Sequence, residues 1–248
     1  MPTSTTDADA IDPASADEAL ALSRLEEQLP PLLSVIAGMV DLTGFFTLGN
    51  IFTAHITGNL VVAAAAAVRG GPLNLAQALA IPVFMAAVAA VGLIARTSGR
   101  HGRDLARLLL LAQFLLLAGV LIFSVITKPS ANPHGLMAGI AVMIAVAAMA
   151  CQFALMRVAI PGAISTAVMT GNLTNTVLSL MDALSPRHPS TRPDAGRLKR
   201  SLYLLLGFLA GCVVAAVAIC WLGDWAWSLP AALAAAAVAL AAAPSPAG

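Results

Sequence analysis

A polar stretch occurs twice in this chain, each time inside apolar sequence. Residues 51–60 and residues 164–173, which lie 113 positions later, are identical at seven of ten positions. Both copies contain the step Thr-Gly-Asn. Polar side chains and unpaired backbone groups are costly in a lipid bilayer, so such a step needs a structural or functional reason. Two copies at corresponding places predict a duplicated membrane unit with this step at its centre.

The composition of the chain favours a membrane protein. Of its 248 residues, 59% are hydrophobic and only 10% are charged, and the mean hydropathy is +0.89. Soluble domains carry about 25% charged residues, and a transmembrane β-barrel would show alternating polarity instead of long apolar runs. We therefore predict an all-α fold, a polytopic bundle of transmembrane helices. Its helices are expected in eight apolar runs: 31–48, 50–68, 74–95, 105–127, 135–156, 162–181, 198–222 and 228–243.

The first 30 residues differ from the rest of the chain. Seven of the twelve acidic residues lie there, beside a single base, Arg24. The segment lacks the basic start and the cleavage site of a secretory signal peptide, so we expect an acidic, largely disordered cytoplasmic tail over residues 1–30. Residues 31–245 then form one integral membrane domain. The three cysteines lie in apolar runs without metal-site spacing and predict neither a disulfide nor a metal site.

The charges of the loops predict how often the chain crosses the bilayer. Basic residues gather in the loops 96–107 and 182–200, and the positive-inside rule places both loops in the cytoplasm. An even number of crossings must therefore lie between these loops, yet three apolar runs do. One of the three must fail to cross, and the weakest is the run 162–181, which carries the second Thr-Gly-Asn step.

By the same argument, the runs 31–48 and 50–68 of the first half together cross the membrane only once. The result is six crossings in two three-span repeats, 31–127 and 135–243, each of which opens with a broken or re-entrant helix. Because three is odd, the second repeat is inverted relative to the first, which is the plan of many secondary transporters. Eight full crossings in two parallel four-helix repeats are the alternative.

Asp41 is the only carboxylate well inside an apolar run. An ionisable group there costs roughly 2.5–3.5 kcal/mol on insertion scales and is a functional hypothesis by default. Helical spacing places Asp41 among small residues such as Gly38, so it faces a seam between helices. Its carboxylate could serve a ligand or a proton, or could hydrogen-bond a broken backbone nearby. His55, the only histidine inside an apolar run, could relay protons with Asp41 or bond a neighbouring helix, and its repeat mate is Val168.

The repeated steps supply most of the other candidate residues. Each glycine allows a break or a close backbone approach, and each asparagine offers donors and an acceptor to a freed backbone or to a ligand. The two threonines of each copy are four residues apart, which predicts that they share a helix face. The other interpretation is that both steps only pack two broken helices together. The predicted ligand-binding or coupling residues are Asp41, Thr53, His55, Thr57, Gly58, Asn59, Gln152, Thr166, Thr170, Gly171, Asn172 and Asn175.

Other motifs carry less information about function. Two Gly-x-x-x-Gly patterns, at 135–139 and 207–211, predict close helix packing. The chain has no phosphate-binding loop, dinucleotide fingerprint, zinc-protease motif or nucleophile elbow, so we expect no enzyme, no cofactor and no metal. Nothing in its charge pattern indicates nucleic acid. The expected partners are membrane lipid and a small solute or a proton.

The first motif resembles the signature of a known family. Gly38-x-x-Asp41, followed by Phe-Thr-Ala-His-Ile-Thr-Gly-Asn at 52–59, is similar to the pattern of the YoaK family. These are small bacterial multi-spanning membrane proteins, catalogued as a domain of unknown function. The resemblance covers about residues 30–245 and implies six spans and a second Thr-Gly-Asn-like step, but no activity. Members commonly show a Gly-x-Gln-Asn-Ala-like stretch before that step, where this chain keeps Gln152 and lacks the asparagine.

The leading functional hypothesis is a secondary transporter or permease-like protein of the bacterial plasma (inner) membrane. A small solute would bind near mid-bilayer between the two Thr-Gly-Asn breaks, with Asp41 as the ionisable element. The alternative is a non-transporting membrane scaffold or partner-binding protein in which the breaks only pack. An intramembrane enzyme would need a second catalytic group facing Asp41, and only His55 is available.

Overall fold

All regular structure in the described part of the chain is helical. The computed structural model describes residues 13–70, 74–164, 166, 169–184 and 195–243. The predicted all-α fold is therefore confirmed. The elements are α1 (Pro13–Thr47), α2 (Ile56–Val68), α3 (Leu75–Thr97), α4 (Gly102–Thr127), the 3₁₀ turn η1 (Pro129–Ala131), α5 (Leu136–Val158), α6 (Met169–Leu184), α7 (Ala195–Leu222), the 3₁₀ turn η2 (Gly223–Trp227) and α8 (Ser228–Ala242).

Each of the eight apolar runs corresponds to one α-helix, but the helices differ in length. Five helical segments of the described chain are long and apolar enough to cross a membrane: α1 from Leu20, then α3, α4, α5, and Leu198–Ala242, which contains α7, η2 and α8. The helices α2 and α6 have only 13 and 16 residues. At about 1.5 Å per residue they are shorter than a hydrocarbon core of about 30 Å. α8 is also short, with 15 residues, but it continues α7 and η2 in one long apolar segment. The two short helices outside the five long segments are therefore α2 and α6, which carry the Thr-Gly-Asn steps.

α1 begins well before the predicted membrane domain. Residues 13–30 are helical, so the expected disordered tail does not extend to residue 30, and residues 1–12 lie outside the described residues. The physical reason is a buried stripe at four-residue spacing: Ala21, Leu25 and Leu29 are at most 6% exposed. Ala21 and Leu25 also line a small hollow with Leu240 of α8. Packing against α8 therefore orders a segment whose composition alone favours disorder.

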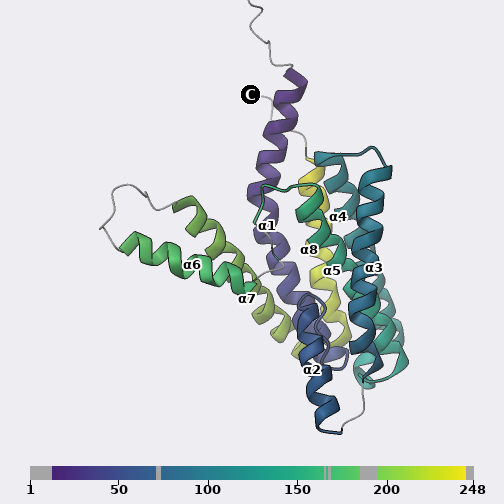
Figure 1. Ribbon diagram of the computed structural model, residues 1–248. Coiled ribbons are helices and arrows are strands. Elements are labelled where there is room, and N and C mark those ends of the chain that lie inside the picture. The colour runs from purple at the N-terminus through teal and green to yellow at the C-terminus, as the bar shows by residue number, and fades with distance from the viewer. Residues whose placement is uncertain (1–12, 71–73, 165, 167–168, 185–194, 244–248) are drawn as a thin grey trace, which may run out of the picture.

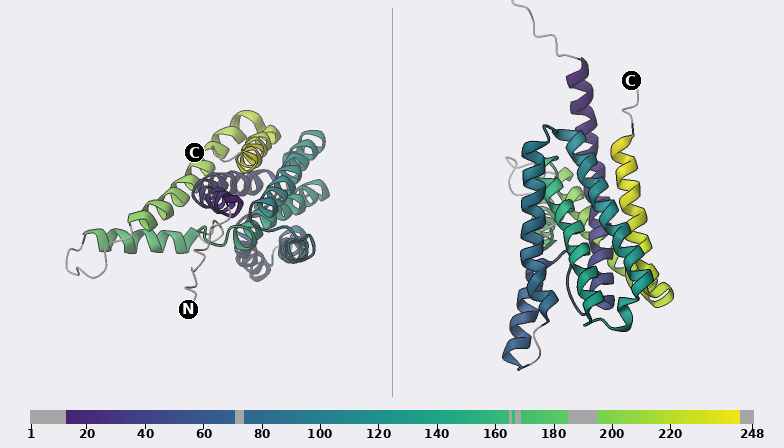
Figure 2. Two further views of the ribbon diagram at one scale, coloured as in Figure 1. Left: turned by 90° about the horizontal axis from the view of Figure 1, so that it is seen from above. Right: turned by 90° about the vertical axis from the view of Figure 1, so that its right-hand side faces the viewer.

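The helices form a bundle around α1, which packs against α7 and α8, while α5 packs against α3 and α4. The start of α1, the α3–α4 loop and the end of α8 lie at one end of the bundle (Figure 2), and η1, η2 and the start of α3 lie at the other. α6 and the first half of α7 extend away from the remaining helices (Figure 1). The two short helices therefore occupy different sides of the bundle, α2 beside α3 and α6 beside α7.

Polar contacts hold the two ends of the bundle. At the first end, the side-chain Nε atoms of Arg103 and Arg107 donate to the Ala241 carbonyl oxygen at 3.0 and 2.8 Å. Cations at a helix C-terminus satisfy its free carbonyls and complement its dipole. At the opposite end, the Ser130 hydroxyl donates to the Asp224 carboxylate at 2.6 Å and joins η1 to η2. These contacts fix the register of α4 against α8.

Glycines allow α1 and α7 to approach closely. A Cβ atom added at Gly211 would overlap the Val35 carbonyl, and one at Gly38 would overlap the Phe208 carbonyl. The predicted close packing at 207–211 is confirmed. At 135–139 it is not found, because a Cβ at Gly139 would meet only the Ala76 methyl group at an ordinary 3.7 Å.

Candidate functional site

The first repeated stretch follows a sharp reversal of the chain. α1 ends at Thr47, and Gly49 and Asn50 then adopt left-handed backbone conformations with φ of +84° and +59°. A Cβ at Gly49 would lie 2.5 Å from the Pro133 carbonyl oxygen, so both conformation and space require glycine there. Residues 51–55 have no regular structure and lead back along α1 to the start of α2. The break therefore lies at Gly49, and Gly44 is still part of α1.

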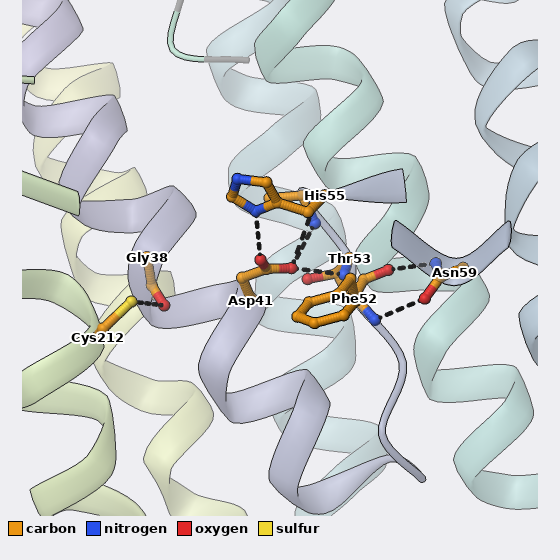
Figure 3. A network of polar contacts seen from close by, with 8 residues as sticks. Gly38, Asp41, Phe52, Thr53, His55, Asn59 and Cys212 are labelled. Atoms are coloured by element: carbon orange, nitrogen blue, oxygen red, sulfur yellow. Dashed lines mark hydrogen bonds and ion pairs between the residues drawn. The ribbon is translucent and has the colours of Figure 1, made fainter. Parts of the chain in front are cut away.

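The carboxylate of Asp41 accepts hydrogen bonds from the backbone N–H groups of this returning segment (Figure 3). Its Oδ1 accepts hydrogen bonds from the backbone N–H groups of Thr53 and Ala54, both at 2.8 Å, and from that of His55 at 3.4 Å. Asp41 is only 4% exposed. An ionised carboxylate can be buried when it is hydrogen-bonded and paired in this way. The prediction that Asp41 lies between helices and can bond a broken backbone is confirmed.

The second oxygen of the same carboxylate meets the imidazole of His55. Asp41 Oδ2 lies 2.6 Å from His55 Nδ1, a geometry that becomes an ion pair when the imidazole is protonated. The His55 side chain is 39% exposed, and its ring packs edge-on against Phe208 of α7, with ring centroids 5.2 Å apart. His55 is thus the partly open end of an otherwise buried polar cluster.

Asn59 closes the same structure from the other side. Its Oδ1 accepts from the backbone N–H of Phe52 at 2.9 Å, and its Nδ2 donates to the Phe52 carbonyl at 2.8 Å (Figure 3). Asn59 is fully buried. A side-chain amide that bonds both polar groups of one residue replaces a missing backbone pairing. The predicted pairing of the Asn59 amide with a freed backbone is confirmed.

Space for this arrangement comes from glycine, and the threonines have separate environments. A Cβ at Gly44 would lie 2.9 Å from Thr53 Cγ2, and one at Gly58 would lie 3.1 Å from the Phe52 ring. Thr53 is buried before α2 begins, whereas Thr57 lies inside α2 and is exposed. The prediction that these two threonines share a helix face is wrong, because the helix starts too late.

Gln152 of α5 organises the second break. Its Nε2 donates to the Leu33 carbonyl of α1 at 2.9 Å and to the Thr166 hydroxyl at 3.3 Å. Its Oε1 accepts from Nε2 of Gln113 on α4 at 2.7 Å. All three polar side chains are at most 2% exposed. Gln152 therefore joins three elements, and sequence reasoning missed Gln113, although it is a polar residue within the run 105–127.

The rest of the second repeated stretch is described only in part. Thr166 lies before α6 and Thr170 lies inside it, so this pair also does not share a helix face. Asn172 is buried, and its carbonyl accepts from the Thr176 hydroxyl at 2.8 Å. Gly171 and Asn175 are half-buried on α6. The repeat mates of Phe52 and His55, Ser165 and Val168, fall outside the described residues.

Two cavities flank the breaks from opposite ends of the bundle. One, of about 330 Å³, lies between α1 and α7 at the end where α1 begins. The other, of about 680 Å³, lies between α3 and α5 at the end where those helices begin and includes part of α2. The first cavity reaches Ile164, just before the second break, and the second reaches Asn50, at the first break.

The described residues offer little for a metal ion. They contain no group of three or more His, Cys, Asp or Glu side chains that could hold one. Cys151, Cys212 and Cys220 are free thiols. The polar groups of the site are a carboxylate, an imidazole, amides and hydroxyls, and most of their hydrogen bonds go to backbone groups.

Comparison with known proteins assigns most of the chain to one family. A family model described as "Protein of unknown function (DUF1275)" matches residues 29–240. A relative from Bacillus subtilis (strain 168), the UPF0700 transmembrane protein YoaK, is 35% identical over 63 residues. This match covers 25% of the chain and 24% of the relative, so it spans about a quarter of either protein. No solved structure matches the chain. The resemblance seen in the first motif is confirmed.

Proposed function

The chain belongs to the DUF1275 family of proteins of unknown function, and on this premise we propose that it is a secondary transporter or permease-like protein for a small solute. The solute binds near the middle of the bilayer, between the two Thr-Gly-Asn breaks. The observation that carries the proposal is the first break, where a buried carboxylate holds the backbone that begins a half-length helix. Interrupted helices at corresponding places mark substrate sites in many secondary transporters. In this proposal the chain is not an enzyme and uses no cofactor.

The proposal includes an inverted repeat. Thr53 and Thr166 are repeat mates, and both lie just before a short helix. The backbone N–H of Thr53 donates to Asp41 on α1, and the hydroxyl of Thr166 accepts from Gln152 on α5, so each bonds to the long helix that precedes it. α1 packs against α7 while α5 packs against α3, so corresponding helices have corresponding neighbours. These parallels support two units of three net crossings each. Six crossings place the loops 96–107 and 182–200, with the start of α1, in the cytoplasm.

The two cavities support a transport cycle. They lie between equivalent helix pairs, α1–α7 and α3–α5, and at opposite ends of the bundle. A pseudo-symmetric protein that opens alternately to each side needs one access route per side, formed by equivalent elements. The α1–α7 cavity reaches Ile164 before the second break, and the α3–α5 cavity reaches Asn50 at the first break, so movement of either break would change the cavity beside it.

His55 is the group through which a solute or a proton reaches the buried cluster. Its ring is partly exposed beside Phe208, while its Nδ1 contacts the Asp41 carboxylate. Protonation or ligand contact at the ring therefore alters the pairing of the carboxylate that holds the first break. The rival function, a scaffold in which the breaks only pack, predicts no solute-dependent stabilisation.

Solute uptake by proteoliposomes tests the proposal. A thermal-shift screen of the purified protein against small metabolites and ions selects the solute, and counterflow then measures its transport. His55→Val and Asn172→Ala should each lower counterflow at least about tenfold if the solute sits between the breaks. Arg100→Ala, at an exposed base of the α3–α4 loop, is the matched control. Unchanged counterflow in both site variants would place the solute elsewhere.

Membrane topology tests the inverted repeat separately. Reporter fusions at residues 70, 100, 131, 190 and 225 sample the connections between helices. Six crossings require the fusions at 100 and 190 on the cytoplasmic side and those at 131 and 225 on the opposite side. Fusions at 100 and 190 on opposite sides would favour eight crossings and remove the inverted repeat.

A further inference from the structure

The cavity between α1 and α7 has a polar rim that the two breaks do not explain. Its volume of about 330 Å³ lies in the range of small-molecule pockets, about 300–1,000 Å³. Glu26 and Glu27 of α1 line one wall, and Lys199 and Arg200 of α7 line the other. The cavity therefore carries carboxylates on one helix and cations on the facing helix.

The opposite charges face the cavity without pairing. Within the described part of the chain, neither carboxylate forms an ion pair with Lys199 or Arg200. The Lys199 ammonium instead lies over the ring of Tyr203, 5.6 Å from its centroid, and Nε of Arg200 donates to the Gly196 carbonyl at 3.3 Å. Two separated charges of opposite sign complement a ligand that carries both charges itself.

Two prolines make the acidic wall a stronger site for a cation. In a regular helix the N–H groups of residues 30 and 31 would bond the carbonyls of Glu26 and Glu27, but Pro30 and Pro31 have no N–H. Both prolines line the cavity. The wall thus combines two carboxylates with two backbone carbonyls that lack their helical donors, and an ammonium group has three N–H donors to offer such acceptors.

The floor of the cavity is apolar and touches the chain that leads to the second break. Pro30, Pro31, Leu204 and Ile164 line it, and Ile164 lies two residues before Thr166. The Glu26 carboxylate lies over the same chain, because a Cβ at Gly162 would be 2.5 Å from Glu26 Oε1. A ligand in this cavity contacts both α1 and the segment that Gln152 holds through Thr166.

We propose that this cavity binds a small zwitterion, an apolar body that carries one ammonium group and one carboxylate, such as an aliphatic amino acid. The ammonium group faces Glu26 and Glu27, the carboxylate faces Lys199 and Arg200, and the body covers the prolines. As the substrate class of transport, this inference rests on the proposed function, whereas binding in the cavity does not depend on it.

Thermal shift of the full-length protein in detergent, with three matched probes, tests the inference. The probes are L-leucine, isoamylamine (leucine without its carboxylate) and 4-methylpentanoate (leucine without its ammonium group). Leucine at saturation should raise Tm by about 5 °C, and the single-charge analogues by less than half as much. Equal shifts with all three probes, or no shift with leucine, would overturn the proposal. A shift that requires phosphatidylethanolamine instead of leucine would also overturn it, because the zwitterion would then be a lipid headgroup.

Substitutions of the two walls locate the binding. Glu26→Gln and Lys199→Ala should each weaken leucine binding about tenfold or more, measured by calorimetry, since each removes one charge from a facing pair. The matched controls, Asp104→Asn and Arg100→Ala, change exposed charges of the same sign away from the cavity. Leucine binding that survives both wall variants would place the site elsewhere and sink the inference. Leucine binding without counterflow would leave the inference standing and count against transport.

Discussion

In both repeated stretches, a polar side chain of the preceding long helix bonds the chain just before a short helix, but the chemical groups differ. At the first break, the Asp41 carboxylate accepts hydrogen bonds from three backbone N–H groups and contacts the His55 imidazole. Asn59 bonds both backbone polar groups of Phe52. At the second break, a neutral amide, Gln152, reaches a hydroxyl at 3.3 Å and divides its bonds among three elements. Charge-assisted hydrogen bonds are roughly twice as strong as neutral ones. The first break is therefore the more firmly held.

The difference assigns different roles to the two halves. α2 packs beside the start of α3 at the lower end of the bundle, whereas α6 and the start of α7 extend away from the bundle (Figure 1). α6 also carries more polar residues, including the exposed Thr174 and the buried Thr176. If the chain transports a solute, we expect the first half to be the fixed frame and the second half to be the moving part. Substitutions that weaken each break in turn can confirm or reverse this assignment.

Removal of the Asp41 carboxylate should have the largest effect. Asp41→Ala leaves two buried N–H groups and the partly buried N–H of His55 without their acceptor, and the expected loss is about 4 kcal/mol of unfolding free energy, enough to reduce the yield of folded protein. Asp41→Asn keeps one acceptor oxygen and should lose about half as much. Size-exclusion profiles and thermal unfolding in detergent measure both. An Asp41→Ala variant as stable as the wild type would remove the proposed anchor.

The close seam of α1 and α7 gives the next largest effect. Gly211→Ala drives a methyl group into the Val35 carbonyl and should destabilise the protein by about 3 kcal/mol. Gly139→Ala, on the facing pair α3–α5, meets only the Ala76 methyl group at 3.7 Å and should change stability by no more than about 1 kcal/mol. Thermal unfolding of the two variants compares the pairs directly. Equal losses would mean that the two helix pairs are packed alike.

Truncation of Asn59 separates the amide from the carboxylate. Asn59→Ala leaves the N–H and carbonyl of the partly buried Phe52 without their side-chain partner, and the expected loss is about 2 kcal/mol. Asn59→Asp retains the acceptor for the N–H but places a second oxygen against the carbonyl, so it should be no better than alanine. If Asn59→Asp unfolds at the wild-type temperature, the pairing with the carbonyl contributes nothing.

Much of the helix arrangement was predictable from sequence, whereas the partners of the polar groups were not. Each predicted apolar run corresponds to one α-helix of the described residues, although α1 begins well before its run, because membrane-spanning helices are marked by their apolar composition. Asp41 and His55 are fourteen residues apart in the sequence, and the reversal of the chain at Gly49 brings them together. Residues 13–30 were misjudged because tertiary packing of Leu25 and Leu29 outweighs an acidic composition. Gln113 and the charged cavity escaped notice because their partners come from distant helices.

Loss of the Gln152 amide tests the weaker break. Gln152→Leu keeps the approximate volume but removes bonds to the Leu33 carbonyl, Thr166 and Gln113. The expected loss is about 1.5 kcal/mol, smaller than for Asp41→Ala, because the groups left behind are neutral. Hydrogen exchange should accelerate around Thr166 more than around Thr53. Equal acceleration at both sites, or a loss as large as that of Asp41→Ala, would reverse the assignment of fixed and moving halves.

Replacement of His55 has the smallest expected effect on stability and the most specific effect on function. His55→Val gives the first stretch the residue that the second stretch has at Val168. The substitution therefore removes one of the polar groups by which the two breaks differ. The imidazole is 39% exposed and bonds only one carboxylate oxygen, and Asp41 keeps its three N–H donors, so the loss should be about 1 kcal/mol or less. If His55 couples solute or proton movement, counterflow falls at least about tenfold while unfolding is nearly unchanged.

His55→Gln, which can donate to the carboxylate but cannot take up a proton near neutral pH, separates the two roles. Recovery of counterflow in His55→Gln would show that a hydrogen bond suffices, whereas its continued loss would assign proton exchange to the first half alone.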